Sequence, residues 1–318
     1  MAKYRDTLPQ LSGGGLFLTD GGIETTLIFH DGLDLPYFAA FDLMKDRSGQ
    51  AALRRYFSTH AAIARDNGHG FILESPTWRA SADWGAKLGY TRADMAEVNK
   101  QSIALLAELR RTFETERSPM VISGCVGPRG DGYNPGEAMT AEAAQAYHAE
   151  QIDAFADTEA DMVTAITTTN LPEAIGITRA AQAAGLPVVI SFTVETDGTL
   201  PSGETLKEAV ETVDAETGNG PVYFMINCAH PDHFSRALAA GESWVRRIRG
   251  LRANASRLSH AELDEAEELD DGNPEEFGAQ HSDLRRLLDH IVVMGGCCGT
   301  DHRHIEAICR ACAPAKAA

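Results

Sequence analysis

The sequence predicts an α/β protein of one domain, a (β/α)8 barrel in which each of eight parallel strands is followed by a helix. Short runs rich in β-branched residues alternate with longer Ala-, Glu- and Arg-rich stretches along the 318 residues. Such alternation implies parallel strands with right-handed crossovers. Polar residues and glycines crowd the carboxyl ends of these runs, where barrel active sites lie. We therefore expect residues 1–318 to form one catalytic domain.

The first four strands are apolar runs that end in polar residues or glycine. They are residues 16–20, 71–75, 120–124 and 161–168. The last three follow amphipathic stretches, which predict helices over residues 51–66, 92–115 and 141–156. Each of these three strands is thus preceded by its own helix, as the fold requires.

The second half of the chain continues this pattern with a weaker signal. A helix over residues 172–184 precedes the fifth strand, residues 187–192. The sixth apolar run ends at Cys228 and the last ends at Gly295. The missing strand has to lie near residues 249–254, where the strand pattern is weak. The polar residues and glycines at the carboxyl ends of the strands favour a closed barrel over an open doubly wound sheet.

An acidic stretch interrupts the alternation before the last strand. Residues 261–277 read AELDEAEELDDGNPEEF. Runs of like charge are usually solvated, so we expect a surface helix and turn inserted between the last two strands. Binding of a cation or a partner is the alternative.

Composition limits the kinds of protein this chain can be. A formal net charge of −18 and a pI near 5.0 argue against nucleic acid and anionic membranes, whose partners are usually basic. Six cysteines in 318 residues do not make a disulfide scaffold. Residues 1–15 lack an apolar signal core, and no run reaches about 18 apolar residues. We expect a cytoplasmic protein with small-molecule partners, and a homo-oligomer stays open.

Three cysteines lie at the ends of two predicted strands and suggest a metal site. Cys228 ends one strand, and Cys297 and Cys298 follow another within a glycine frame. Glycines permit the backbone angles that let two consecutive side chains converge. Three thiolates suit Zn²⁺ and leave one position open for water or substrate. Core cysteines, or a closed site with a fourth ligand such as His230, are the alternatives.

These residues resemble the homocysteine S-methyltransferases, and the resemblance spans nearly the whole chain. The motifs that carry it are residues 20–25 (DGGIET), 77–81 (TWRAS), 124–128 (GCVGP), 227–228 (NC) and 295–300 (GGCCGT). Members of this family are zinc-dependent (β/α)8 barrels that transfer a methyl group to a thiol. The resemblance implies that Cys228, Cys297 and Cys298 are the zinc ligands and form the catalytic centre.

The implied activity is methyl transfer from a small sulfonium or quaternary ammonium donor to a zinc-activated thiol. The thiol would be homocysteine, which gives methionine, or a related acceptor. A metal deprotonates a coordinating thiol, and orientation of the donor supplies much of the remaining rate. A zinc hydrolase on the same barrel is a second hypothesis, and a non-catalytic zinc- or thiol-sensing protein is a third.

The resemblance also implies substrate contacts. Asp20 would help to hold the substrate, although an Asp here also suits a helix cap. Gly21 would let a ligand approach the backbone. Glu24 is either a further contact or part of the first turn of a helix. Trp78, which stands where Tyr or Phe is usual, and Asn227, beside the first cysteine, complete the predicted set.

One departure from the family pattern concerns the acceptor. The family typically has a Glu-Thr pair after the fourth strand, and its Glu grips the amino group of homocysteine. This chain has Ile166 and Thr167 there. An acceptor without an amino group, or one held by another acid such as Glu74, would fit the change.

Two further signals are interpreted as ordinary structure. Cys309 and Cys312 form a CxxC, but they continue a helical stripe of apolar residues, so core packing is expected. His302 and His304 follow the last strand at the start of a helix, and we expect them at the surface.

Overall fold

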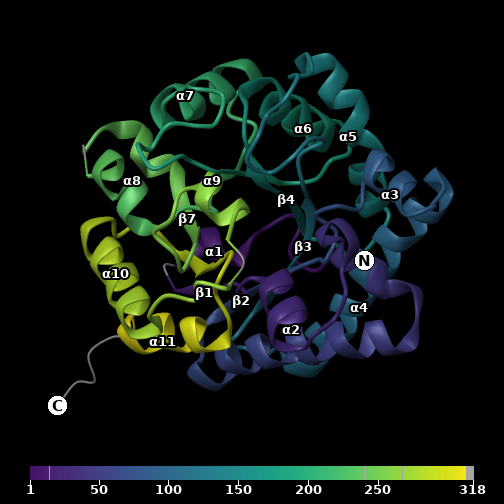
Figure 1. Cartoon of the computed structure of the whole chain (residues 1–318), viewed down its shortest axis with the longest axis horizontal. Coiled ribbons are helices and arrows are strands. Elements are labelled where there is room, and N and C mark those ends of the chain that lie inside the picture. The colour runs from purple at the N-terminus through teal and green to yellow at the C-terminus, as the bar shows by residue number, and fades with distance from the viewer. Residues whose placement is uncertain (14, 240, 267, 313–318) are drawn as a thin grey trace.

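The strands close into one parallel barrel in the computed structural model, which describes residues 1–312 apart from 14, 240 and 267 (Figure 1). Each strand pairs with its neighbours in sequence, and the first pairs with the last. The strands are β1 (Phe17–Leu18), β2 (Gly70–Glu74), β3 (Met120–Val126), β4 (Met162–Thr168), β5 (Val188–Phe192), β6 (Tyr223–Asn227), β7 (Ile248–Ala253) and β8 (Val293–Gly296). This confirms the predicted (β/α)8 fold.

Helices form a ring around the barrel (Figure 1). They are α2 (Arg47–Asn67), α3 (Ala82–Lys87), α4 (Arg92–Phe113), α5 (Ala141–Ala156), α6 (Leu171–Ala183), α7 (Leu206–Thr217), α8 (Pro231–Leu238), α10 (Pro274–Leu287) and α11 (His302–Cys312). Shorter pieces are α1 (Pro9–Ser12), α9 (His260–Asp264), η1 (Thr25–His30), η2 (Pro36–Phe38), η3 (Ala40–Lys45) and η4 (Ser243–Arg247). None of the helices in the described part of the chain combines the length and the hydropathy needed to cross a membrane.

Local sequence sets the ends of several helices. At α4, the Thr91 hydroxyl accepts from the Asp94 N–H and the Asp94 carboxylate accepts from the Thr91 N–H. At α7, Thr205 and Glu208 form the same reciprocal pair. These capping boxes satisfy backbone donors that the first turn leaves without partners.

Two sequence predictions concern the region between β6 and β8. β7 lies where the missing strand was expected. Most of residues 261–277 is exposed, as predicted. The stretch is not entirely an insertion, however, because α10 begins at Pro274 and buries Phe277 beside His304 of α11. Its last four residues thus belong to the regular helix between β7 and β8.

The amino-terminal end of the barrel interior is apolar. Side chains from every strand except β7 form one buried cluster there, together with Leu8 and with Val292, the residue before β8. Its members are Leu8, Phe17, Ile72, Val121, Met162, Val189, Tyr223, Met225, Val292 and Val293. Leu8, next to α1, and Leu11, within it, pack on this cluster, so the amino-terminal segment covers this end of the barrel. The open end of the interior is therefore the opposite one.

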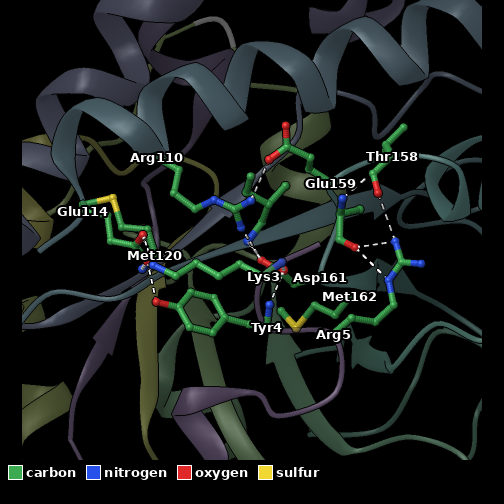
Figure 2. A network of polar contacts seen from close by, with 12 residues as sticks. Lys3, Tyr4, Arg5, Arg110, Glu114, Met120, Thr158, Glu159, Asp161 and Met162 are labelled. Carbon is green, nitrogen blue, oxygen red and sulfur yellow. Dashed lines mark hydrogen bonds and ion pairs between the residues drawn. The ribbon is translucent and has the colours of Figure 1, made fainter. Parts of the chain in front are cut away.

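The covering segment is fastened by Asp161, a fully buried carboxylate (Figure 2). Its Oδ1 accepts from the backbone N–H groups of Lys3 and Tyr4 at 2.8 and 2.7 Å. Its Oδ2 accepts from Arg110 Nη1 at 2.7 Å and from the Ile122 N–H at 2.9 Å. Four donors thus satisfy both oxygens, as a buried charge requires.

A second acid reinforces the same contact (Figure 2). Glu114 accepts from Lys3 Nζ at 2.5 Å, from the Tyr4 hydroxyl at 2.6 Å and from the Met120 N–H at 3.0 Å. Beside it, the Arg5 guanidinium donates to three backbone carbonyls, those of Ala156, Thr158 and Ala160. The amino-terminal segment is therefore held by both charge and backbone hydrogen bonds.

A polar layer follows the apolar one toward the carboxyl ends of the strands. Side chains two residues apart on a strand point to the same face. Each polar residue lies two positions after a member of the apolar cluster: Glu74, Ser123, Thr164, Ser191 and Asn227. All five are buried. The barrel interior thus changes from apolar to polar below the mouth.

Candidate metal centre

The structure brings the three predicted cysteines together at the mouth of the barrel. Their Sγ atoms all lie within 4.8 Å of one another. Cys228 and Cys297 are joined sulfur to sulfur as a disulfide, and Cys298 is a free thiol with its Sγ 3.9 Å from that of Cys228. In the described part of the chain, this is the one group of His, Cys, Asp or Glu side chains that gathers ligand atoms in this way.

This cluster fits a thiophilic metal ion. A tetrahedral Zn²⁺ with Zn–S bonds of about 2.3 Å holds its sulfurs about 3.8 Å apart. The Cys228–Cys298 separation of 3.9 Å matches that spacing. Cys297 belongs to the same set once its bond to Cys228 is reduced, since metal ligands are thiolates. His230, the fourth ligand of the alternative closed site, is not in the group: it caps α8, where its Nδ1 accepts from the Asp232 N–H.

Two residues beside the cluster have backbone angles that are rare for side chains other than glycine. Cys228 has a φ of 51° and Thr167 a φ of 63°. They touch, because the Thr167 hydroxyl lies 3.8 Å from Cys228 Sγ. Such conformations cost about 1–3 kcal/mol each and persist where the surrounding structure fixes them, often at functional sites. The unusual backbone at the end of β4 and the one just after β6 therefore meet at Cys228.

Asn227 holds these two strand ends in place. Its Oδ1 accepts from the Thr167 N–H at 3.0 Å and from the Ser191 hydroxyl at 2.6 Å. Its Nδ2 donates to the Thr167 hydroxyl at 2.9 Å. We had expected a substrate contact, but both amide atoms of this fully buried side chain face the protein. Asn227 thus positions Thr167 and the following Cys228.

Asp20 is buried at the end of β1 and is paired with two side chains. Its Oδ1 accepts from Arg252 Nη2 at 2.7 Å, and its Oδ2 accepts from the Tyr56 hydroxyl at 2.9 Å. Arg252 comes from β7 and also faces Glu74 Oε2, at 3.7 Å. The guanidinium therefore lies between two carboxylates, and Asp20 is part of a network that crosses the barrel.

Two carboxyl groups near the mouth have strongly raised pKa values. Burial raises the pKa of Glu74 to about 7, although the nearby Arg252 opposes the shift. Glu74 Oε1 has no hydrogen-bond partner among the described residues. Burial also raises the pKa of Glu24 to about 7, with a smaller contribution from the charge of Asp20. Either group can exchange a proton near neutral pH, a property common in functional sites.

Gly21 and Gly22 lie against the backbone of the turn that carries the two adjacent cysteines. A Cβ on Gly21 would lie 3.0 Å from the carbonyl oxygen of Thr300, and one on Gly22 would lie 2.5 Å from that of Cys297. The glycines therefore admit the protein's own backbone at close range, and a ligand contact at Gly21 stays a prediction. They let the turn that carries Cys297 and Cys298 pack directly on the end of β1.

The end of β4 presents an apolar surface where the family pattern has an acid. Ile166 is 8% exposed, and its carbonyl accepts from Trp78 Nε1 at 3.1 Å. The ring of Trp78 lies beneath the Arg79 guanidinium, which is 4.0 Å from its centroid. The indole of Trp78 is therefore held against the end of β4. The side chain at position 166 is apolar, where the family pattern has a Glu.

Two side chains at the cluster had not been predicted. The Tyr133 hydroxyl lies 3.3 Å from Cys298 Sγ. Its ring stacks on His260, with centroids 4.0 Å apart and planes at 16°. His260 Nε2 is 2.8 Å from the Cys228 carbonyl oxygen. Tyr133 lies in the loop between β3 and α5, and His260 is the first residue of the short helix α9. Neither position carries a pattern that points to the cysteines.

Comparison with known proteins identifies relatives over almost the whole chain. The family model for homocysteine S-methyltransferase matches residues 17–312. Homocysteine S-methyltransferase 4 of Zea mays is 23% identical, over 94% of this chain and 90% of that protein. Homocysteine S-methyltransferase 1 of Brassica oleracea var. italica is 22% identical, over 93% of each.

Solved structures support the same fold. The metallated form of the homocysteine methyltransferase MmuM from Escherichia coli matches with a TM-score of 0.72 and 20% identity, over 94% of this chain and 96% of that one. Its oxidized form matches with a TM-score of 0.73 and 21% identity, over 96% and 99% of the two chains. At this level of identity, the match concerns the barrel and its connections.

Proposed function

This chain belongs to the homocysteine S-methyltransferase family and is a methyltransferase, and we propose that it methylates a small thiol with zinc as its cofactor. The observation that carries the proposal is the three-sulfur cluster at the carboxyl ends of β6 and β8. This is the face of the barrel at which enzymes of this fold place their active sites. The methyl donor would be a small sulfonium or quaternary ammonium compound.

Cys228, Cys297 and Cys298 are the residues that would hold the metal. Bound zinc would supply the acidity that turns an acceptor thiol into a thiolate at neutral pH. The MmuM relative exists in metallated and oxidized forms, and we extend the metallated form to this chain. The all-cysteine donor set favours thiol chemistry over a zinc hydrolase, whose ligands are mostly His and carboxylate.

The protein's own residues would orient the reactants. Asn227 and Thr167 fix the end of β6, so that the first cysteine has one position relative to the other two. Trp78 is fixed at the end of β4 by its hydrogen bond to the Ile166 carbonyl, one residue before Thr167. Holding donor and acceptor in line supplies a large part of the rate in such transfers.

The names of the relatives make homocysteine the first acceptor to test. The apolar end of β4 supports a related thiol equally well, because Ile166 cannot pair with an ammonium group. Asp20 is already occupied by Arg252 and Tyr56. Glu24 and Glu74 are the remaining acids that we propose for any cationic group of the substrates.

Metal content tests the ligand assignment. Reduced protein should bind one zinc per chain, and Cys298→Ala should bind none while its circular dichroism stays unchanged. Cys309→Ala is the matched control, since that thiol is buried in α11 away from the site. Zinc measured by mass spectrometry at full stoichiometry in Cys298→Ala would refute the assignment.

Acceptor choice is tested by a screen of thiols against methyl donors. Homocysteine and thiols without an amino group should be offered with S-methylmethionine and with betaine, and methylated product measured by mass spectrometry. Ile166→Glu should increase the use of homocysteine relative to the other thiols by about tenfold, the effect of one modest charge pair. Ile166→Gln has the same shape without the charge and should not. Absence of transfer to any thiol by zinc-loaded wild type would contradict the proposed function.

A further inference from the structure

Each sulfur of the cluster has a neutral hydrogen-bonding group beside it. The pairs are Cys228 with Thr167 Oγ1 at 3.8 Å, Cys297 with Asn227 Nδ2 at 4.0 Å and Cys298 with Tyr133 Oη at 3.3 Å. The Tyr133 contact is the shortest of the three. It is also the one that comes from a loop, the segment between β3 and α5, rather than from the end of a strand.

Tyr133 is held in place by the opposite side of the site. Its ring stacks on His260 at 4.0 Å. His260 is fixed in turn, because its Nε2 lies 2.8 Å from the Cys228 carbonyl oxygen and its Nδ1 lies 3.3 Å from Glu195 Oε1. Tyr133 therefore connects the turn that carries Cys298 with the end of β6 that carries Cys228.

The direction of the Tyr133 contact follows from its chemistry. A phenol has an ordinary pKa near 10 and carries its proton at neutral pH. A thiolate accepts hydrogen bonds and has no proton to give. When Cys298 acts as a metal ligand, the hydroxyl must therefore donate to its sulfur. Cys298 Sγ is the hydrogen-bond partner of this hydroxyl among the described residues.

We propose that Tyr133 is a positioning residue for the metal ligand Cys298, with the ring of His260 as its support. The inference rests on the proposed function, because it requires a metal at the three sulfurs. Groups that hydrogen-bond metal ligands fix their orientation, and their loss typically weakens metal binding by 10- to 100-fold. Cys298 needs such support, because it is the exposed member of the set and lies in a turn.

Replacement of Tyr133 by Phe removes the hydroxyl and keeps the stacked ring. The zinc dissociation constant of reduced protein, measured by competition with a chromophoric chelator, should rise by about 10- to 100-fold. Absorption of the Co²⁺-loaded variant should show a shifted sulfur-to-cobalt charge-transfer band. Tyr147→Phe is the control, because it removes a hydroxyl that donates to Ser81 Oγ at 2.9 Å and should leave both measurements unchanged.

A double-mutant cycle tests the role of the support. His260→Ala should weaken zinc binding, and the double variant should bind no worse than Tyr133→Phe alone, since both changes act through one contact. Additive losses would show that His260 acts independently. If His260→Ala does not fold, the Tyr133→Phe and Tyr147→Phe pair decides the question.

The possible results separate this inference from the proposed function. Failure of reduced wild type to bind zinc would remove the metal site and the inference together. Zinc binding by wild type, with an equal dissociation constant and an unshifted Co²⁺ spectrum in Tyr133→Phe, would overturn the inference and leave the metal site intact.

Discussion

The two ends of the barrel each bury a carboxylate beside an arginine, but only one of these pairs is complete. At the amino-terminal end, Asp161 accepts from Arg110 and three backbone N–H groups, and both of its oxygens are satisfied. At the mouth, Glu74 lies 3.7 Å from Arg252 and has one oxygen without a hydrogen-bond partner. The same two chemical groups are thus used in different ways.

This difference between the Asp161 and Glu74 pairs suggests that one end of the barrel serves stability and the other serves chemistry. A fully satisfied buried charge fixes the structure, whereas an incompletely satisfied one keeps a raised pKa and remains reactive. In barrels of this kind the amino-terminal face serves stability and the carboxyl-terminal face serves catalysis.

The largest loss of stability is expected when the fully hydrogen-bonded Asp161–Arg110 pair is broken. Asp161→Ala leaves Arg110 buried without its main partner and should lower the free energy of unfolding by about 3–5 kcal/mol. Asp157→Ala is the control, since that exposed side chain lies 3.8 Å from Lys100 and should cost under about 1 kcal/mol. Urea titrations measure both. Methyl transfer per folded molecule should be unaffected, and a selective loss of activity in Asp161→Ala would contradict the separation.

The contribution of Glu74, beside Arg252, to the free energy of unfolding should depend on pH. The pKa of Glu74 is raised from about 4.5 to about 7 in the fold, so native protein keeps a proton that the unfolded chain releases between these values. Stability from this group therefore falls as pH rises through that window and is constant above it. Glu74→Gln cannot lose the proton, and its stability relative to wild type should increase by up to about 3 kcal/mol between pH 4.5 and pH 7.

Urea titrations of Glu74→Gln and wild type at several pH values measure this change. Glu108→Gln, in which an exposed side chain of α4 is altered, provides the baseline. A constant difference between Glu74→Gln and wild type over the whole range would mean that Glu74 is charged throughout. The two ends of the barrel would then be alike.

Removal of the metal should lower stability only through the cysteine site at the mouth of the barrel. At free zinc a hundredfold above the dissociation constant, chelation should lower the free energy of unfolding of the reduced protein by about 2.7 kcal/mol. Asp161→Ala should show the same decrement, because distant sites are additive. Cys298→Ala should show none. Thermal unfolding with and without chelator measures all three, and a smaller decrement in Asp161→Ala would reveal coupling between the ends.

The smallest loss of stability is expected at the hydrogen bond between Tyr4 and Glu114, beside the Asp161–Arg110 pair. Tyr4→Phe removes one hydrogen bond to Glu114 and should cost about 1 kcal/mol. Tyr37→Phe, with a half-exposed ring, is the control and should be neutral. Steady-state kinetics should give unchanged kcat and KM for both variants. A raised KM in Tyr4→Phe would link the covering segment to the site.

The fold was largely predictable because its signal is local and repeated. Seven strands were visible as apolar runs. β7 was weak because Arg249 and Arg252 interrupt it. Arg252 is buried because Asp20 lies 2.7 Å away, and that partner is 232 residues distant in sequence. A pattern read along one strand cannot show a charge pair that forms across the barrel.

The candidate site was predictable only where it follows strand ends. The cysteines belong to such a motif, and the structure places them together. Tyr133, from a loop, and His260, from the first turn of the short helix α9, are brought together by the tertiary fold, and neither belongs to a strand-end motif. His304, expected at the surface, is fully buried, because its Nε2 meets the Asp271 carbonyl oxygen at 2.9 Å and its Nδ1 lies 3.3 Å from Asp301. Partners supplied by the tertiary fold decided all three positions.

The covering segment has a consequence for how the chain is made. The hydrogen-bond and ion-pair partners of residues 3–5 lie between positions 114 and 161, whereas closure of the barrel requires β8 at Val293–Gly296. During synthesis, the amino-terminal segment can therefore dock onto β3 and β4 before the ribosome has translated the second half. We expect the docked segment to cover the apolar amino-terminal ends of the strands already made, before the later strands are added.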